Sequence, residues 1–436
     1  PFVLGQLQGD FGEAARASMY ATPQHTEAVA QPLEECVAIA RECGRADAAQ
    51  ACDFDKCRNL AGADLRHMNL TGAKLDYCNL TGTLFGHADC DGASLYGATA
   101  RGASFRETAL YRANLDRSIL SGAIFSDAAM ERATMQEAVG DGADFDGAYM
   151  HLADLDRSDL SDAVFRNADL TRGSITAAVL NGADFTGADM RNANIRSLYE
   201  ADGVTFDKVN LEGTGITDCH FHHCSFEDAQ LSGSLWEDTQ FNFGYFNGAV
   251  WEGARMSDIG FEGARLEGAN FDNVVLDQTR FTHASFNHAS FRNAYLKETD
   301  MRGVEAHSSN FDGAYLVLAS FDNAALELST FDGATLTDSN WVGAKLDHAS
   351  FTNTVGHDKA DFSGVVGRLI NLDCEEPCCS CGAGADVKAK NEMRFTAHSS
   401  YQTIDKDTGH FDLAAALDAR LKTSRLSTRS RPTGSG

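Results

Sequence analysis

The chain has 436 residues, and its 36 lysines and arginines against 63 aspartates and glutamates give a formal net charge of −27. Such acidity disfavours direct binding to nucleic acid or to an anionic membrane, because both carry negative charge. The sequence contains no run of about 18 apolar residues, so it predicts no transmembrane helix. The N-terminus lacks the basic and apolar regions that are typical of a signal peptide. We therefore expect a cytoplasmic location with no membrane insertion.

Residues 1–50 differ from the rest of the chain and are predicted to form an N-terminal helical cap region. A short amphipathic helix is predicted from residues that share one face: Leu33, Cys36, Ala40 and Cys43. Acidic residues in its first turn suit the helix dipole. Such a helix would cover the open end of the structure that follows, with a partner-binding role as the alternative.

A five-residue repeat dominates residues 51–195. From Leu60 to Ile195 nearly every fifth residue is apolar, and a small residue stands two positions before most of these centres. Typical units are Gly62-Ala63-Asp64-Leu65 and Gly142-Ala143-Asp144-Phe145. Neither the helical period of 3.6 nor the strand period of 2 explains this pattern. It predicts short sides separated by corners, with the small and the large residue of each unit pointing inward.

The repeat changes register once and then resumes. Residues 196–205 form the slip, since Ile195 and Phe206 are separated by two repeats plus one residue. A second block follows over residues 206–362, with regular centres as far as Phe351. The slip is predicted to be a corner loop, with a kink or an interface as alternatives.

A longer period of 20 residues sets the number of sides. Every fourth centre of the first block falls in one aromatic column: Phe85, Phe105, Phe125, Phe145, Phe165 and Phe185. Four sides therefore make one turn, and stacked turns form a solenoid whose core consists of such columns. The narrow interior leaves room for one large residue per side, which explains the alanines.

Units such as Ala143-Asp144-Phe145 and Ala183-Asp184-Phe185-Thr186-Gly187 resemble those of the pentapeptide-repeat proteins. The resemblance implies an all-β solenoid, a right-handed quadrilateral parallel β-helix with short helical caps or tails. The family is functionally diverse, so the resemblance gives the fold more directly than the function.

Residues 363–436 form a C-terminal segment with cysteines, a helix and a basic tail. The helix is predicted over Phe411 to Leu426, as a cap or a docking helix. A metal site is not predicted. The cysteines that come closest to one are Cys374, Cys378, Cys379 and Cys381, whose spacing departs from paired zinc ligands. Disulfide or redox chemistry is an alternative for them, and reduced thiols are the default without export.

The segment Cys219-His220-Phe221-His222-His223-Cys224 looks like a metal cluster when read linearly. The register places both cysteines inward and the three histidines outward, so a shared ion is not expected. No phosphate-binding loop or catalytic motif occurs, and the regular repeats leave no long loops to build a cleft. We expect no enzymatic activity and no cofactor.

The charge is concentrated in residues 210–280, which hold 12 acidic and three basic residues. This stretch predicts an acidic face for a protein partner, and the C-terminal helix is a second candidate surface. The preferred hypothesis is a protein-interaction scaffold or structural rod. This hypothesis is compatible with a homo-oligomer. The alternative is an acidic DNA mimic acting on DNA gyrase or another DNA-binding protein, as in quinolone-resistance proteins of the family. Interleaved arginines such as Arg66, Arg101 and Arg106 argue against mimicry.

Overall fold

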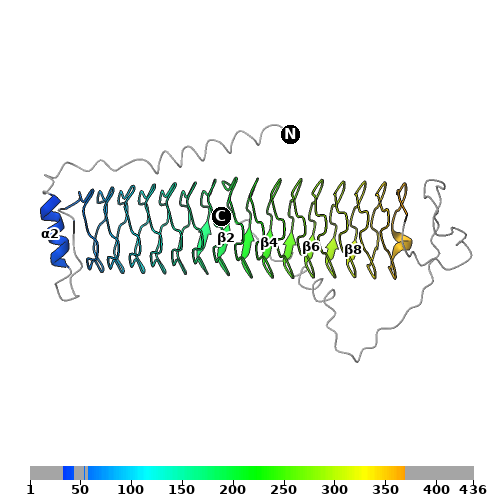
Figure 1. Ribbon diagram of the computed structural model, residues 1–436, viewed down its shortest axis with the longest axis horizontal. Coiled ribbons are helices and arrows are strands. Elements are labelled where there is room, and N and C mark those ends of the chain that lie inside the picture. Colours follow the sequence, from blue (N-terminus) through cyan, green and yellow to red (C-terminus); the bar gives the residue numbers. More distant parts are fainter. Residues whose placement is uncertain (1–32, 44–53, 55–56, 369–436) are drawn as a thin grey trace, which may run out of the picture. The chain divides into compact units, whose positions relative to one another are not determined.

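The computed structural model describes residues 33–43, 54 and 57–368, all within the first of two compact units, Pro1–Phe395. Residues 57–368 wind into a stack of similar turns along one axis (Figure 1). Parallel bridges join residues 20 apart, as between Asp64 and Leu84. Four such series run along the stack, so each turn has four sides. The predicted four-sided parallel solenoid is confirmed.

One of the four sides forms a regular sheet, and we call it the strand face. Its strands pair in chain order, each with the next, and all are parallel. Residues 20 or 21 apart face each other, as in the pair Ile175 and Ile195. The strands are β1 (Ser174–Thr176), β2 (Asn194–Arg196), β3 (Gly215–Thr217), β4 (Leu235–Glu237), β5 (Arg255–Ser257), β6 (Val275–Asp277), β7 (Tyr295–Lys297) and β8 (Tyr315–Val317). The other sides pair through single bridges.

The interior is filled by the two inward residues of each repeat. The phenylalanine column is fully buried, and its rings stack from turn to turn, with centroids 4.6 Å apart for Phe85 and Phe105 and 4.9 Å apart for Phe125 and Phe145. Most polar residues at the small inward position form internal hydrogen bonds, although the buried hydroxyl of Thr279 has no partner among the described residues. The hydroxyl of Thr83, for example, donates to the carbonyl oxygen of Leu60 at 2.7 Å. The predicted inward and outward assignment is confirmed.

The corners need left-handed backbone, and they pair bulky residues with glycines one turn later. Phe243 has φ 60° and its ring lies over Gly263, where a Cβ atom would come within 2.8 Å of it. Tyr77 lies over Gly97 in the same way, with 2.7 Å to a Cβ. A corner glycine therefore has two roles: it adopts the left-handed φ that the corner requires, and its missing Cβ leaves space for the side chain of the preceding turn.

The register slip is a single inserted residue. Bridges before and after it span 20 residues, whereas the bridges that cross it span 21, as between Val179 and Glu200. Leu198 fills the inward place usually held by a small residue, Ala201 fills the place of a large one, and both are buried. Tyr199 between Leu198 and Glu200 is the extra residue and is 55% exposed.

The stack continues through the slip and beyond the last regular centre. Phe185 stacks on Phe206 at 5.1 Å, so the aromatic column is unbroken. A second insertion occurs at the short helix η1 (His357–Lys359), because Thr335 pairs with Val355 but Asn340 pairs with Asp361. Both insertions lie at the corner that follows the strand face. The bridge series ends at Val366.

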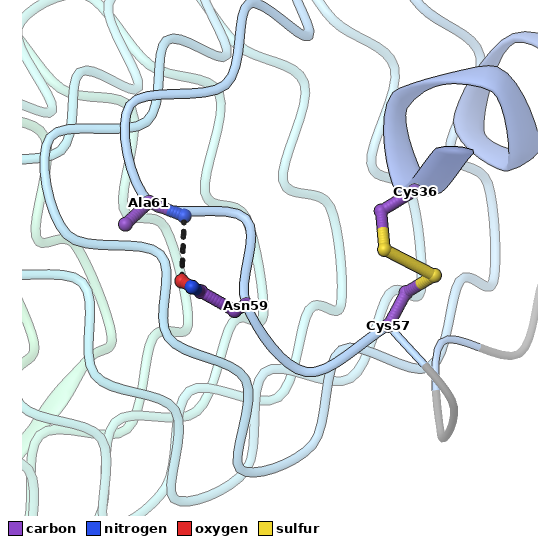
Figure 2. Close-up of a disulfide and its surroundings, with 4 residues drawn as sticks. All are labelled: Cys36, Cys57, Asn59 and Ala61. Carbon is purple, nitrogen blue, oxygen red and sulfur yellow. Dashed lines mark hydrogen bonds between the residues drawn. A yellow bond between two sulfur atoms is a disulfide. The ribbon is translucent and has the colours of Figure 1, made fainter. Parts of the chain in front are cut away.

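The predicted N-terminal helix is present as α2 (Leu33–Cys43). Cys36 and Ala40 are buried as expected, but Leu33 is 39% exposed, so it does not belong to the buried face. Cys36 forms a disulfide with Cys57 that ties α2 to the first turn (Figure 2). Beside it the Ala61 amide donates to Asn59 Oδ1 at 3.3 Å, which orders the first corner. The expectation of reduced cysteines is wrong for this pair.

The stacked core predicts a large difference between inward and outward substitutions. Phe145 lies between Phe125 and Phe165, 4.9 and 4.7 Å from their ring centroids. Phe145→Ala should lower the free energy of unfolding by about 3–5 kcal/mol through lost contacts and a cavity. Asp146→Ala, at an exposed position next to it, should change stability by no more than about 0.5 kcal/mol. Denaturant unfolding measures both, and equal effects would refute the assignment of inward and outward residues.

The disulfide predicts a redox-dependent cap. Its two cysteines are 21 residues apart, a loop for which closure stabilises the folded state by about 3 kcal/mol. Paired Cys36→Ser and Cys57→Ser substitutions should expose the first turn to proteolysis between α2 and Leu60 and leave the later turns resistant. Limited proteolysis with mass spectrometry tests this, with Cys78→Ala, which changes a buried cysteine of the core, as control. Unchanged cleavage in the double variant would show that the disulfide does not hold the cap.

Candidate functional site

The described residues contain no group of three or more histidine, cysteine or acidic side chains placed to hold a metal ion. None of the described helices is long and apolar enough to cross a membrane. The predicted cysteine group Cys374, Cys378, Cys379 and Cys381 lies outside the described residues, as does the predicted C-terminal helix. Candidate sites are therefore sought on the outer surface of the solenoid.

The segment with two cysteines and three histidines is divided between inside and outside, as the register predicts. Cys219 and Cys224 are buried, and burial raises the pKa of each thiol to about 12. The Cys224 thiol donates to the carbonyl oxygen of Ala201 at 3.1 Å. These cysteines therefore act as small core residues, while the histidines project outward.

The outward histidines form a patch with aromatic residues at the register slip. We call it the slip patch: Tyr199, His220, His222, His223 and Phe243. Tyr199 meets His220 edge to face at 5.4 Å, and the imidazoles of His220 and His222 have centroids 5.9 Å apart. His223 stacks on Phe243, one turn further on, at 5.9 Å.

Carboxylates hold the ends of this patch. The Tyr199 hydroxyl donates to Asp218, and His223 Nδ1 lies 3.0 Å from Asp202 Oδ1. Burial lowers the pKa of His222, and the neighbouring His220 adds to the effect. The patch thus combines exposed rings with negative charge, and the inserted Tyr199 is the residue that the sequence pattern could not place.

The acidic stretch 210–280 does not form one face. It winds around more than three turns, so its carboxylates are distributed over all four corners. Some are neutralised locally, as Asp272 is by Arg292 at 2.6 Å and Asp277 by Lys297 at 3.2 Å. Burial opposes ionisation of Asp272, but hydrogen bonds from Arg292 and Ser290 outweigh it and lower the pKa of the carboxyl. The predicted single acidic face is therefore wrong.

One column of acids does line up, and we call it the acid ladder: Asp218, Asp238 and Asp258. Each directly follows a strand, at the ends of β3, β4 and β5, and occupies the same corner position with left-handed backbone. Within the described part of the chain no lysine, arginine or histidine forms an ion pair with them. Three carboxylates therefore repeat one turn apart along one edge, beside the slip patch.

In the first repeat block, residues 51–195, several acidic residues form ion pairs with arginines. Arginines pair with acids of their own or a neighbouring turn, as in Arg66 with Asp64 and Arg112 with Asp91, each at 2.7 Å. The Arg66 guanidinium lowers the pKa of the Asp64 carboxyl to about 2. Arginines interleaved with the acidic residues thus neutralise part of the negative charge of this block.

Four-sided parallel turns built from a five-residue repeat define a class of β-solenoid proteins. Eight copies of a family model described as pentapeptide repeats match the chain, and the matched ranges include 58–86, 88–127, 123–162, 158–196, 261–297 and 284–323. The chain belongs to the pentapeptide-repeat family.

Several solved structures are similar to parts of the chain. A trypsin-treated variant of QnrB1, a plasmid-mediated fluoroquinolone resistance protein, is 22% identical with a TM-score of 0.31, covering 40% of this chain and 91% of that chain. HetL, involved in heterocyst differentiation regulation in the cyanobacterium Nostoc, is 20% identical with a TM-score of 0.13, covering 63% and 89%.

A pentapeptide repeat protein of the Arabidopsis thaliana thylakoid lumen is 26% identical with a TM-score of 0.17, covering 25% of this chain and 65% of that chain. TM-scores this low give no basis for transferring function. A search of curated proteins finds no match to this chain.

Burial of the cysteines predicts inert thiols. At pH 8 Cys219 and Cys224, with pKa values of about 12, should react with iodoacetamide more than about 100-fold more slowly in the folded protein than after unfolding in guanidinium. Mass spectrometry of the labelled peptides measures both states. Labelling at the same rate in both would place these thiols on the surface.

Proposed function

We propose that this protein is a non-enzymatic scaffold that binds other proteins along the outer surface of its solenoid. The observation that carries the proposal is the acid ladder, a row of carboxylates that the described chain leaves without cationic partners. Aligned like charges repel one another, and a basic surface on a partner protein would relieve this repulsion. The inward side chains fill the core completely, so recognition falls to the surface.

The geometry favours a partner that binds along an edge of the solenoid where equivalent residues repeat from turn to turn. The strand face beside the ladder is a continuous parallel sheet of eight strands, and its side chains stand at the spacing of the turns. A partner with basic residues in a regular row would match it. A homo-oligomer through the same edge is disfavoured, because two acidic ladders repel each other. The Cys36–Cys57 disulfide favours an oxidising compartment over the cytoplasm.

The second candidate is a DNA mimic acting on DNA gyrase or another DNA-binding protein. The acid ladder supports it, since a row of negative charges on an elongated stack resembles one strand of phosphates. The ion pairs of the first block weaken it, because they neutralise the track over many turns. We expect no effect on gyrase supercoiling. Salt-sensitive inhibition lost on charge reversal of the ladder would favour mimicry over the scaffold.

The scaffold proposal is tested by reversing the ladder. The double variant Asp238→Lys and Asp258→Lys should keep its fold, because Lys208 occupies an equivalent left-handed corner with φ 57°. Immobilised protein should retain its partners from an extract of the native source about 5-fold less when the ladder is reversed, and added salt should also release them.

The matched control is Asp141→Lys with Asp146→Lys, which makes the same change in charge at exposed corners of the first block. Retention should be unchanged in this control. Equal losses in both double variants would mean that total charge rather than the ladder recruits partners, and the proposal would fail.

A further inference from the structure

We propose that the slip patch is a binding site for arginine side chains of an extended segment in a partner protein. This rests on the proposed function, because it assumes that the solenoid binds proteins, and it names the chemistry that one site recognises. The site lies at the first of the two insertions in the described solenoid, where the inserted Tyr199 projects from the repeat.

The rings of the patch are held in place before any partner binds. The Tyr199 hydroxyl is fixed by Asp218 and its ring by His220. Phe243 is 55% exposed, yet its ring is confined between His223 on one side and the bare Cα of Gly263 on the other. Side chains that are already ordered lose little conformational entropy on binding, which is typical of aromatic binding residues.

The charges around the rings select a cation. Asp202 and Asp218 stand at the two ends of the patch, and the side chains of Asp202 and His223 are about two-thirds exposed, so they are open to solvent. A cation above an aromatic face beside a carboxylate gains from both interactions. The planar guanidinium stacks on rings and pairs with carboxylates better than an ammonium group does, so arginine fits this surface better than lysine.

The chain itself uses the same contact next to the patch. The guanidinium carbon of Arg265 lies 5.5 Å from the ring centroid of Tyr245, which is two residues after Phe243. Arg117 lies over Tyr96 at 5.8 Å in the first block. Tyr199 and Phe243 are each more than half exposed, and within the described residues no arginine lies over either ring. A partner's arginines would complete this arrangement.

The test compares two labelled peptides with the full chain, an octapeptide of alternating glycine and arginine and its lysine counterpart. Fluorescence anisotropy at physiological salt should show about 5-fold tighter binding of the arginine peptide. The double variant Tyr199→Leu and Phe243→Leu keeps apolar bulk but removes the rings, so it should reduce this preference to less than about 2-fold. Tyr149→Leu, at a 60% exposed position of the first block, is the control and should keep the preference.

Equal binding of the two peptides, or a preference that survives in the double variant, would overturn the assignment. Analytical sedimentation of the protein without peptide tests whether a second copy of the chain occupies the patch instead. A dimer that is present in the unmodified protein and absent in the double variant would assign the patch to a second copy. The two proposals fail separately. Ladder reversal without effect on retained partners removes the proposed function, whereas a lost arginine preference with a working ladder removes only this site.

Discussion

Backbone hydrogen bonding between successive turns is the constraint on which the rest of this structure depends. It holds each turn about 4.8 Å from the next, and the ring spacings of the aromatic column follow it closely, as in the 4.7 Å between Phe105 and Phe125. At this spacing the square interior has room for one large and one small side chain per side. The interior is therefore full, and every residue that interacts with another molecule must stand outside.

The same spacing governs the charges on the surface. Any residue has its equivalents 20 positions away on the turns above and below, so identical charges in one column are brought together. The first block relieves this with arginines, as Arg166 pairs with Asp184 at 2.6 Å. The acid ladder of the second block is not relieved in this way within the described chain. Each adjacent exposed pair costs below about 1 kcal/mol in water, a cost that the hydrogen-bonded stack tolerates and a basic partner would remove.

Both insertions occur at the corner after the strand face, and the local backbone explains why. There the chain stays extended through the residue that follows the inward centre, as in β2 and β3, before it turns. An additional residue can be absorbed at this corner because the pairs that cross it change their spacing from 20 to 21 residues, as between Asp184 and Thr205, while later pairs return to 20. Since the interior is full, the additional side chain must project outward. Tyr199 thereby becomes a surface residue next to the outward histidines, and an irregularity of the repeat produces the most distinctive patch of the surface.

The sequence by itself determined the period, the four sides and the inward or outward direction of nearly every side chain. It also placed Cys219 and Cys224 inside and the histidines between them outside, because a side chain in a regular repeat depends only on its position within five residues. It predicted the helix around Cys36 but not its exposed Leu33. Only the tertiary structure decided which residues of different turns meet: that Cys36 pairs with Cys57, that the acids of 210–280 divide among the corners while Asp218, Asp238 and Asp258 align, and that Tyr199 is the inserted residue beside His220. The physical reason is that periodicity fixes local direction, whereas the residue that absorbs a shift in register is chosen by packing in a full interior.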